Sequence, residues 1–240
     1  MTPLLTLSIV SHGQAPLIRL LLDDFEHSEF QDFEVLLTIN LPEDEAAFGQ
    51  HTFPLRILRN LSPKGFGANH NAAFAHAQGR FFAIVNPDIR LDSFDAVTMT
   101  APFVDPSTGA VAPLILSRER TIEDSVRRFP TFFRLARRVL LRRWHPDYRW
   151  DDLPIDVDWT AGMFVVFRPE AFKGVGGFDD RRFFMYFEDV DICERLWKNG
   201  WSVKLQPLTS VIHDAQRQSH RSWKHMRWHL TSAARYLSGL

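Results

Sequence analysis

The stretch Phe81-Phe82-Ala83-Ile84-Val85-Asn86-Pro87-Asp88 predicts the centre of the fold. Five apolar residues in a row, with Gly79 before them and Pro87 after them, are typical of a strand that is buried on both faces of a sheet. Because proline has no amide hydrogen to donate to a neighbouring strand, the strand is expected to end there. Asp88 then lies at the carboxyl end of a central strand, where open α/β sheets bind their ligands.

The residues that end this strand are compatible with two structures. The carboxylate of Asp88 and the amide of Asn86 offer the oxygen ligands that divalent cations such as Mg²⁺ prefer. Asn, Pro and Asp are also the residues that favour an ordinary turn. A motif this short does not separate a metal site from a turn, so the rest of the chain has to decide between them.

Strand-like and helix-like segments alternate before this strand. Apolar, β-rich runs occur at 4–10, 33–39 and 55–58, and segments of helical character lie at 15–25 and 68–77. Alternation of this kind predicts an α/β fold with a mostly parallel central sheet flanked by helices.

The second half of the chain predicts shorter strands and two further helices. Strands are expected at 110–116, at 157–167 with an interruption at 160–162, at 201–205 and at 210–213, and helices at 186–199 and 220–240. No internal repeat or low-complexity linker divides the sequence, so the 240 residues are expected to form one domain.

Composition excludes several classes of protein. The net charge of −1 argues against a protein that binds nucleic acid electrostatically. No apolar run approaches the roughly 20 residues that span a bilayer, and the first residues lack the basic leader of a signal peptide. Cys193 is the single cysteine, which excludes an internal disulfide framework and favours a reducing compartment such as the cytoplasm.

Three acids cluster at the start of a predicted helix. Glu188, Asp189 and Asp191 follow the aromatic-rich run 183–187. Acids in a first turn interact favourably with the helix dipole, and Asp191 can pair with Arg195 four residues later, which gives part of the cluster a structural explanation. Aromatic side chains beside a carboxylate can also raise its pKa and orient it as a general base, and this is the interpretation that we favour.

Two further sites are weaker predictions. His213 ends a predicted strand, as Asp88 does, and the two side chains can therefore share a metal ion, although a lone histidine is more often structural. The loop Lys64-Gly65-Phe66-Gly67 precedes a predicted helix, so its amide groups can face a phosphate. Two glycines without a longer nucleotide-binding fingerprint do not establish such a site.

Two segments of the chain are strongly basic. Residues 127–143 carry seven arginines and no acid, with apolar residues at helical spacing, and the residues after Asp214 are also basic and include Trp223 and Trp228. One interpretation is a solvated helix face. The other is an amphipathic helix on anionic lipid, which would give the protein peripheral contact with the inner face of the cell membrane.

Taken in order, these motifs resemble the inverting GT-A glycosyltransferases of family 2, in particular the bacterial rhamnosyltransferase-like branch that builds surface polysaccharides. The resemblance covers about residues 5–222. Four blocks carry it: residues 7–12; Asn60 with 65–71, Gly79 and 86–88; residues 160–164, 176–179 and 184–191; and residues 211–213 with Ser219. It implies a GT-A fold in which residues 1–90 form the nucleotide-sugar half, 91–215 the acceptor and catalytic half, and 216–240 a basic helix.

The resemblance also implies roles for single residues. Asp88 and His213 would hold Mg²⁺ or Mn²⁺ against the diphosphate of the donor. Asp189 would deprotonate the acceptor hydroxyl, with Glu188 beside it. The residues implied in donor binding are Ser11, Asn40, Lys64, Gly65, Gly67, Asn71, Asn86 and Asp88. The residues implied on the acceptor side are Thr160, Ala161, Gly162 and Asp191.

The sequence departs from the family pattern at two places. Thr38-Ile39-Asn40-Leu41-Pro42 stands where family members often carry Asp-Asn-x-Ser, and His12 replaces a usual aromatic residue. Both positions concern recognition of the nucleotide.

The sequence therefore predicts an inverting, metal-dependent glycosyltransferase that works in the cytoplasm. Its donor would be a nucleotide-sugar, with dTDP-rhamnose as the first candidate, and its acceptor a hydroxyl of a cell-surface polysaccharide or a lipid-linked glycan. Two alternatives stay open at this point: a non-catalytic homologue that binds sugar nucleotides, and a metal-dependent nucleotidyltransferase. The helix start at Glu188 and Asp189 favours the first function, because nucleotidyl transfer needs no base there.

Overall fold

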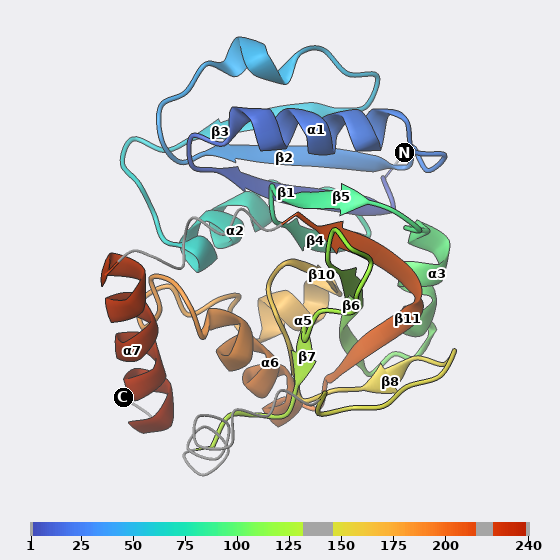
Figure 1. The fold of residues 1–240 in the computed structure, drawn as a ribbon, viewed down its shortest axis with the longest axis vertical. Coiled ribbons are helices and arrows are strands. Elements are labelled where there is room, and N and C mark those ends of the chain that lie inside the picture. Colours follow the sequence, from blue (N-terminus) through green and yellow to red (C-terminus); the bar gives the residue numbers. More distant parts are fainter. Residues whose placement is uncertain (1, 132–145, 215–222, 239–240) are drawn as a thin grey trace.

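A single mixed sheet runs through the molecule in the computed structural model, which describes residues 2–131, 146–214 and 223–238 (Figure 1). Within these residues the sheet has nine strands in the order β3-β2-β1-β4-β10-β6-β11-β5, and β8 pairs with β11. A two-stranded sheet of β7 and β9 lies beside it. The expected α/β fold with a mostly parallel central sheet is confirmed.

The first half of the sheet is entirely parallel. Its strands are β1 (Leu5–Ser11), β2 (Phe33–Ile39), β3 (Leu55–Arg59) and β4 (Phe81–Val85), and its connections include α1 (Ala15–Glu26), the 3₁₀ turn η1 (Glu45–Phe48) and α2 (Phe66–Phe74). All five residues of β4 are buried, as the apolar run predicts, because β4 lies between β1 and β10.

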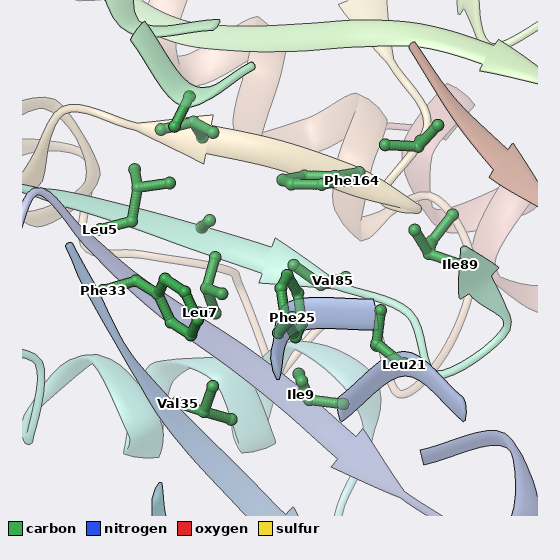
Figure 2. Close-up of a cluster of buried hydrophobic side chains, with 14 of the residues drawn as sticks. Leu5, Leu7, Ile9, Leu21, Phe25, Phe33, Val35, Val85, Ile89 and Phe164 are labelled. Atoms are coloured by element: carbon green, nitrogen blue, oxygen red, sulfur yellow. The ribbon is translucent and has the colours of Figure 1, made fainter. Parts of the chain in front are cut away.

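Each face of this half of the sheet packs against helices through its own apolar cluster. One face packs Leu5, Leu7 and Ile9 of β1 against Leu21 and Phe25 of α1 (Figure 2). On the other face, Phe82 and Ile84 of β4 belong to a second apolar cluster with residues of the later helices. This alternation of neighbouring residues follows from the pleat of a strand that is buried on both faces.

The second half adds strands of both directions. Its elements are β5 (Ile89–Leu91), α3 (Ala96–Thr100), η2 (Ala101–Val104), β6 (Thr108–Leu116), β7 (Val126–Arg127), β8 (Ile155–Asp156), β9 (Trp159–Thr160), β10 (Phe164–Phe167), α5 (Pro169–Gly174), α6 (Glu188–Lys198), β11 (Ser202–His213) and α7 (Trp223–Ser238). β10 is antiparallel to both β4 and β6, whereas β11 is parallel to β6.

Several expected element boundaries are wrong, for physical reasons. The strands expected at 201–205 and 210–213 form one strand, β11, because a bulge between Gln206 and Ser210 accommodates Pro207, Leu208 and Thr209 without ending the strand. The helix expected at 68–77 is α2, which starts at Phe66 because Gly65 serves as its N-cap, and which ends at Phe74. The segment 157–167 separates into β9 and β10 on either side of its interruption.

The basic segment at 127–143 lies largely outside the described residues. The basic helix expected at 220–240 is present as α7. Across the described ranges, no helix combines the length and the apolar character needed to cross a membrane.

Candidate active site

The turn at residues 160–163 is hydrogen-bonded both to the residue after β4 and to the first turn of α6. On one side, the carbonyl of Met163 accepts a hydrogen bond of 2.8 Å from the amide of Asn86. On the other side, the amide of Gly162 donates to Oδ2 of Asp189 at 3.2 Å. One turn of backbone therefore lies between the two places where the sequence predicts a metal and a base.

Asp88 and His213 lie together at the end of the sheet, as their positions after two strands predict. Oδ2 of Asp88 is 3.3 Å from Nε2 of His213. The amide of Asp214 donates to the carbonyl of Asp88 at 2.8 Å, which joins the end of β11 to the residues after β4.

Glu123 completes this cluster and was missed by sequence reasoning. Its Oε2 lies 2.9 Å from Nδ1 of His213. It comes from the irregular segment after β6, where neither periodicity nor a motif marks it. Burial acts to lower the pKa of His213, but hydrogen bonds and charge from Asp88 and Glu123 outweigh burial and raise that pKa to about 9.

The residues of this cluster suit a divalent cation. Oδ1 of Asp88 is buried and has no hydrogen-bond partner within the described residues. A carboxylate and an imidazole are ligands that Mn²⁺ accepts, and a carboxylate partner on the other imidazole nitrogen, such as Glu123, is the usual support for a metal-binding histidine. Within the described residues, no three His, Cys, Asp or Glu side chains are placed so that all of them could hold one metal ion. Further ligands would therefore come from a diphosphate or from water.

Asp189 is held by backbone donors at the first turn of α6. Gly162 donates to Oδ2, and the amide of Val190 donates to Oδ1 at 2.9 Å. Burial raises the pKa of Asp189, and these backbone hydrogen bonds act in the opposite direction.

Glu188 has a different environment from its neighbour. It is 6% exposed, and its Oε2 is buried without a hydrogen-bond partner in the described part of the chain. Burial and the charge of Asp189 raise the pKa of Glu188 to about 8. The two neighbouring acids therefore differ in their donors: backbone amides donate to Asp189, whereas the raised pKa of Glu188 favours its protonated form near neutral pH.

The backbone before these acids is in an unusual conformation. Tyr186 and Phe187 have φ angles of 71° and 69°, in the left-handed region. Residues other than glycine rarely adopt this region of φ. Those that do occur most often where the surrounding structure fixes a functional geometry. The helix expected from residue 186 therefore begins at Glu188, and the two acids are presented in its first turn.

The helix α7 packs against this aromatic loop (Figure 1). Ser232 donates from Oγ to the carbonyl of Met185 at 2.9 Å. Ring centroids are 5.0 Å apart between Phe184 and Trp228 and 5.6 Å apart between Phe187 and Tyr236. The last helix thus supports the strained backbone that carries the candidate base.

Asn40 shapes the loop 64–67 through its amide. Its Oδ1 accepts from the amide of Lys64 at 2.8 Å and from Nδ2 of Asn60 at 2.7 Å, and its Nδ2 donates to the carbonyl of Lys64 at 3.0 Å. Nδ2 also lies 2.9 Å from Nδ1 of His12. His12, which departs from the family pattern, therefore contacts Asn40, the residue of the Asp-Asn-x-Ser run that this chain keeps.

Close backbone approaches explain the glycines of this loop. A Cβ on Gly65 would lie 2.4 Å from the carbonyl oxygen of Phe184, and a Cβ on Gly67 would lie 2.6 Å from Cβ of Phe178. The amide of Phe66 donates to the same Phe184 carbonyl at 3.1 Å, so this amide is used within the protein. The loop 64–67 and the loop before α6 are therefore in direct backbone contact.

Other predicted site residues make structural contacts. Asn71 exchanges hydrogen bonds with the backbone of Phe178, at 2.8 and 2.9 Å. Asp191 forms the expected pair with Arg195 at 2.8 Å and also contacts Arg182 at 3.4 Å. Ser11 accepts from the amide of Gln14 at 3.2 Å. Their roles toward donor or acceptor stay predictions, as do those of Thr160 and Ala161.

Comparison with known proteins identifies the family. No family model matches the chain. Rhamnosyltransferase WbbL from Escherichia coli (strain K12) is 30% identical over 245 residues, which are 96% of this chain and 91% of that protein. The chain belongs to the family-2-like GT-A glycosyltransferases. This glycosyltransferase is also 34% identical over 149 residues to the N-acetylglucosaminyl-diphospho-decaprenol L-rhamnosyltransferase of Mycobacterium tuberculosis (strain ATCC 25618 / H37Rv), a match that covers 58% of this chain and 48% of that relative.

Solved structures show the same fold. GalNAc-T7 with UDP, GalNAc and Mn²⁺ superposes with a TM-score of 0.70 at 14% identity, over 90% of the glycosyltransferase and 44% of that chain. The mannosyltransferase PcManGT from Pyrobaculum calidifontis, in complex with GDP-Man and Mn²⁺, has a TM-score of 0.64 at 19% identity, over 98% and 65% of the two chains. The expected GT-A fold and enzyme class are confirmed.

Proposed function

We propose that this glycosyltransferase transfers rhamnose from dTDP-rhamnose, with inversion, to a hydroxyl of a lipid-linked or growing surface glycan. The turn 160–163 carries the proposal, because its hydrogen bonds to Asn86 and Asp189 bring the candidate metal site and the candidate base to one place. The sugar is taken from the two relatives whose names state rhamnosyl transfer, and a lipid-linked acceptor is taken from the second of them.

Asp88 and His213 would hold the divalent cation, with Glu123 fixing the orientation of the imidazole ring. When bound, Mg²⁺ or Mn²⁺ neutralises negative charge that develops on the diphosphate leaving group. The Mn²⁺ bound in two proteins of the same fold supports this assignment.

Asp189 would act as the single base of a direct displacement. The acceptor hydroxyl gives its proton to the Asp189 carboxylate, and its oxygen forms a bond to the anomeric carbon of the donor. The bond from that carbon to the diphosphate breaks, and the nucleoside diphosphate leaves with the electron pair. Attack opposite to the leaving group inverts the anomeric configuration, and one positioned base suffices for it.

A product assay tests the proposal. The enzyme is incubated with Mn²⁺, an N-acetylglucosaminyl-diphospho-prenol and, separately, dTDP-rhamnose, dTDP-glucose, UDP-N-acetylglucosamine or GDP-mannose. We expect dTDP release and a rhamnosylated product of inverted configuration with the first donor alone. Pyrophosphate release would support a nucleotidyltransferase, and donor binding without transfer would support a non-catalytic homologue; either result contradicts the proposal.

A variant pair tests the metal site through donor binding. Asp88→Ala is expected to remove the Mn²⁺-dependent part of donor binding, measured by calorimetry with and without EDTA. Asp92→Asn is the matched control, because Asp92 lies four residues further on and pairs with Arg120 at the surface. Equal metal dependence in the Asp88→Ala variant and the wild type would contradict the assignment of Asp88.

A further inference from the structure

A cavity of about 620 Å³ lies beside the turn 160–163. Its walls come from the irregular segment 122–126 and from the segment 146–150. The side chains that give these walls their chemistry are Ile122, Glu123, Asp124, Tyr148, Arg149 and Trp150. Of these lining residues, Glu123 also belongs to the cluster with Asp88 and His213 described above.

Two residues that line the cavity also contact the candidate active site. Glu123 lines it and also accepts from the ring of His213. Ser125 lines it as well, and its carbonyl accepts from the amide of Ala161 at 2.8 Å, next to the Gly162 amide that donates to Asp189. A molecule in the cavity would therefore lie one backbone hydrogen bond away from the turn that supports the base.

The aromatic walls of the cavity are fixed before any ligand arrives. The hydroxyl of Tyr148 donates to Oδ1 of Asp158 and accepts from the amide of Asp158, both at 2.7 Å. Trp150 is partly buried and packs against the second apolar cluster. Rigid aromatic surfaces lose little conformational entropy on binding and favour ligands with a flat apolar face.

The charged groups of the walls complement hydroxyls better than phosphates. Two carboxylates, Glu123 and Asp124, lie among the lining residues with one guanidinium, Arg149. Carboxylates accept hydrogen bonds from hydroxyl groups, whereas they repel the diphosphate of a donor. Glu123 pairs with His213 at 2.9 Å and Asp124 pairs with Arg127 at 3.1 Å, but a carboxylate has further lone pairs that sugar hydroxyls can use and an alkyl chain cannot.

We propose that this cavity binds a pyranose ring of the acceptor glycan, with Trp150 and Tyr148 against its apolar face and carboxylates toward its hydroxyls. The proposal rests on the proposed function, since it names the place where that acceptor binds. It makes Trp150 a residue that determines affinity for the acceptor and has no part in donor binding.

Acceptor kinetics of three variants test this site. Trp150→Ala is expected to raise the acceptor KM by about tenfold, the effect of losing one apolar contact in a specificity pocket, with the donor KM unchanged. Ile122→Trp fills the cavity from a position that is 55% exposed, so it should raise the acceptor KM without a folding defect. Leu153→Ala is the control, because Leu153 is 68% exposed and does not line the cavity.

Each variant is measured with two acceptors that share one sugar and differ in lipid, a long prenyl chain and a short alkyl chain. A sugar site predicts the same rise in KM for both acceptors. A rise confined to the long-chain acceptor would assign the cavity to the lipid and overturn the proposal, as would a rise in the donor KM.

Folding of the variants and glycosyl transfer by the wild type are checked separately. Thermal unfolding and calorimetric donor binding report whether Trp150→Ala is folded; if it is not, Ile122→Trp decides, and an unchanged acceptor KM in that variant overturns the proposal. Absence of transfer by the wild type with every donor would contradict the proposed function itself, a result that is distinct from a variant effect.

Discussion

Glu188 and Asp189 are adjacent acids whose carboxyl groups have different hydrogen-bond donors. Backbone amides of Gly162 and Val190 donate to Asp189 and favour its charged form. Glu188 has a buried oxygen without such a donor in the described residues, and its pKa is raised to about 8. These backbone hydrogen bonds make Asp189 the better candidate for the base of the two neighbours.

Asp189→Asn is expected to abolish transfer while the donor still binds. The amide keeps the size of the side chain and still accepts from Gly162, but it cannot take a proton, so kcat should fall by about 10²- to 10⁴-fold. Steady-state kinetics and calorimetric donor Kd measure the two effects. Glu170→Gln, an exposed acid in the first turn of α5, is the control. Turnover near that of the wild type would exclude Asp189 as the base.

The protonation of Glu188 predicts a pH-dependent stability. Its pKa is about 8 in the folded protein and 4.5 in the unfolded chain, so the folded state holds an extra proton between these values. The free energy of unfolding therefore falls as pH rises through this window, by at most about 1.4 kcal/mol per pH unit. Glu188→Gln should not show this loss.

Urea unfolding at about pH 5 and about pH 8 measures the free energy of unfolding of the wild type and of the Glu188→Gln variant. The stability of the variant relative to the wild type should increase with pH. Glu170→Gln again serves as the control. Parallel pH profiles for the wild type and the Glu188→Gln variant would show that Glu188 ionises normally.

At the scale of elements, α7 supports the loop that precedes α6. The left-handed residues Tyr186 and Phe187 are unfavourable by about 1–3 kcal/mol each unless their surroundings hold them. The contacts from Ser232, Trp228 and Tyr236 provide that support from one helix. The position of the base therefore depends on a helix that contributes no predicted catalytic group.

Ser232→Ala tests this support. It removes the hydrogen bond to the Met185 carbonyl, a net loss of about 1 kcal/mol, and should lower kcat by about fivefold with little change in the donor KM. Ser238→Ala is the matched control, because Ser238 bonds only to Arg235 of its own helix among the contacts described. Equal kcat values for both variants would contradict a positioning role for α7.

Sequence patterns predicted the elements whose residues are buried on both faces. The run 81–85 predicted β4 with its boundaries. Asp88 and His213 lie together as expected, and the antiparallel register of β5 and β11, which places Ile89 opposite His213, is what brings them there. Glu123 was not predictable, since it lies in an irregular segment placed by long-range contacts. The start of α6 was missed because two aromatic residues occupy a conformation that propensity disfavours.

At the scale of the whole molecule, charge is unevenly distributed along the sequence. The net charge is −1, yet the residues from 127 to 143 carry seven arginines and no acid. Most of that segment lies outside the described residues, so its amphipathic character stays a sequence prediction.

Vesicle binding tests the peripheral membrane contact. The protein should cosediment with vesicles that contain phosphatidylglycerol and not with pure phosphatidylcholine vesicles, and added salt should release it. Replacing Arg134, Arg137 and Arg138 with glutamine should weaken binding. The same change at Arg19, Arg56 and Arg181, which lie on the surface, is the control. Binding that salt does not affect would contradict electrostatic attachment.

The contact between Gly65 and the Phe184 carbonyl joins the candidate donor loop 64–67 directly to the segment before α6. Because Gly65 has no side chain, the two backbones touch directly. A donor that moves the loop 64–67 is therefore expected to move the segment before α6 as well. A nucleotide that binds to the loop 64–67 is therefore expected to affect the position of the candidate base, Asp189, before any acceptor is present.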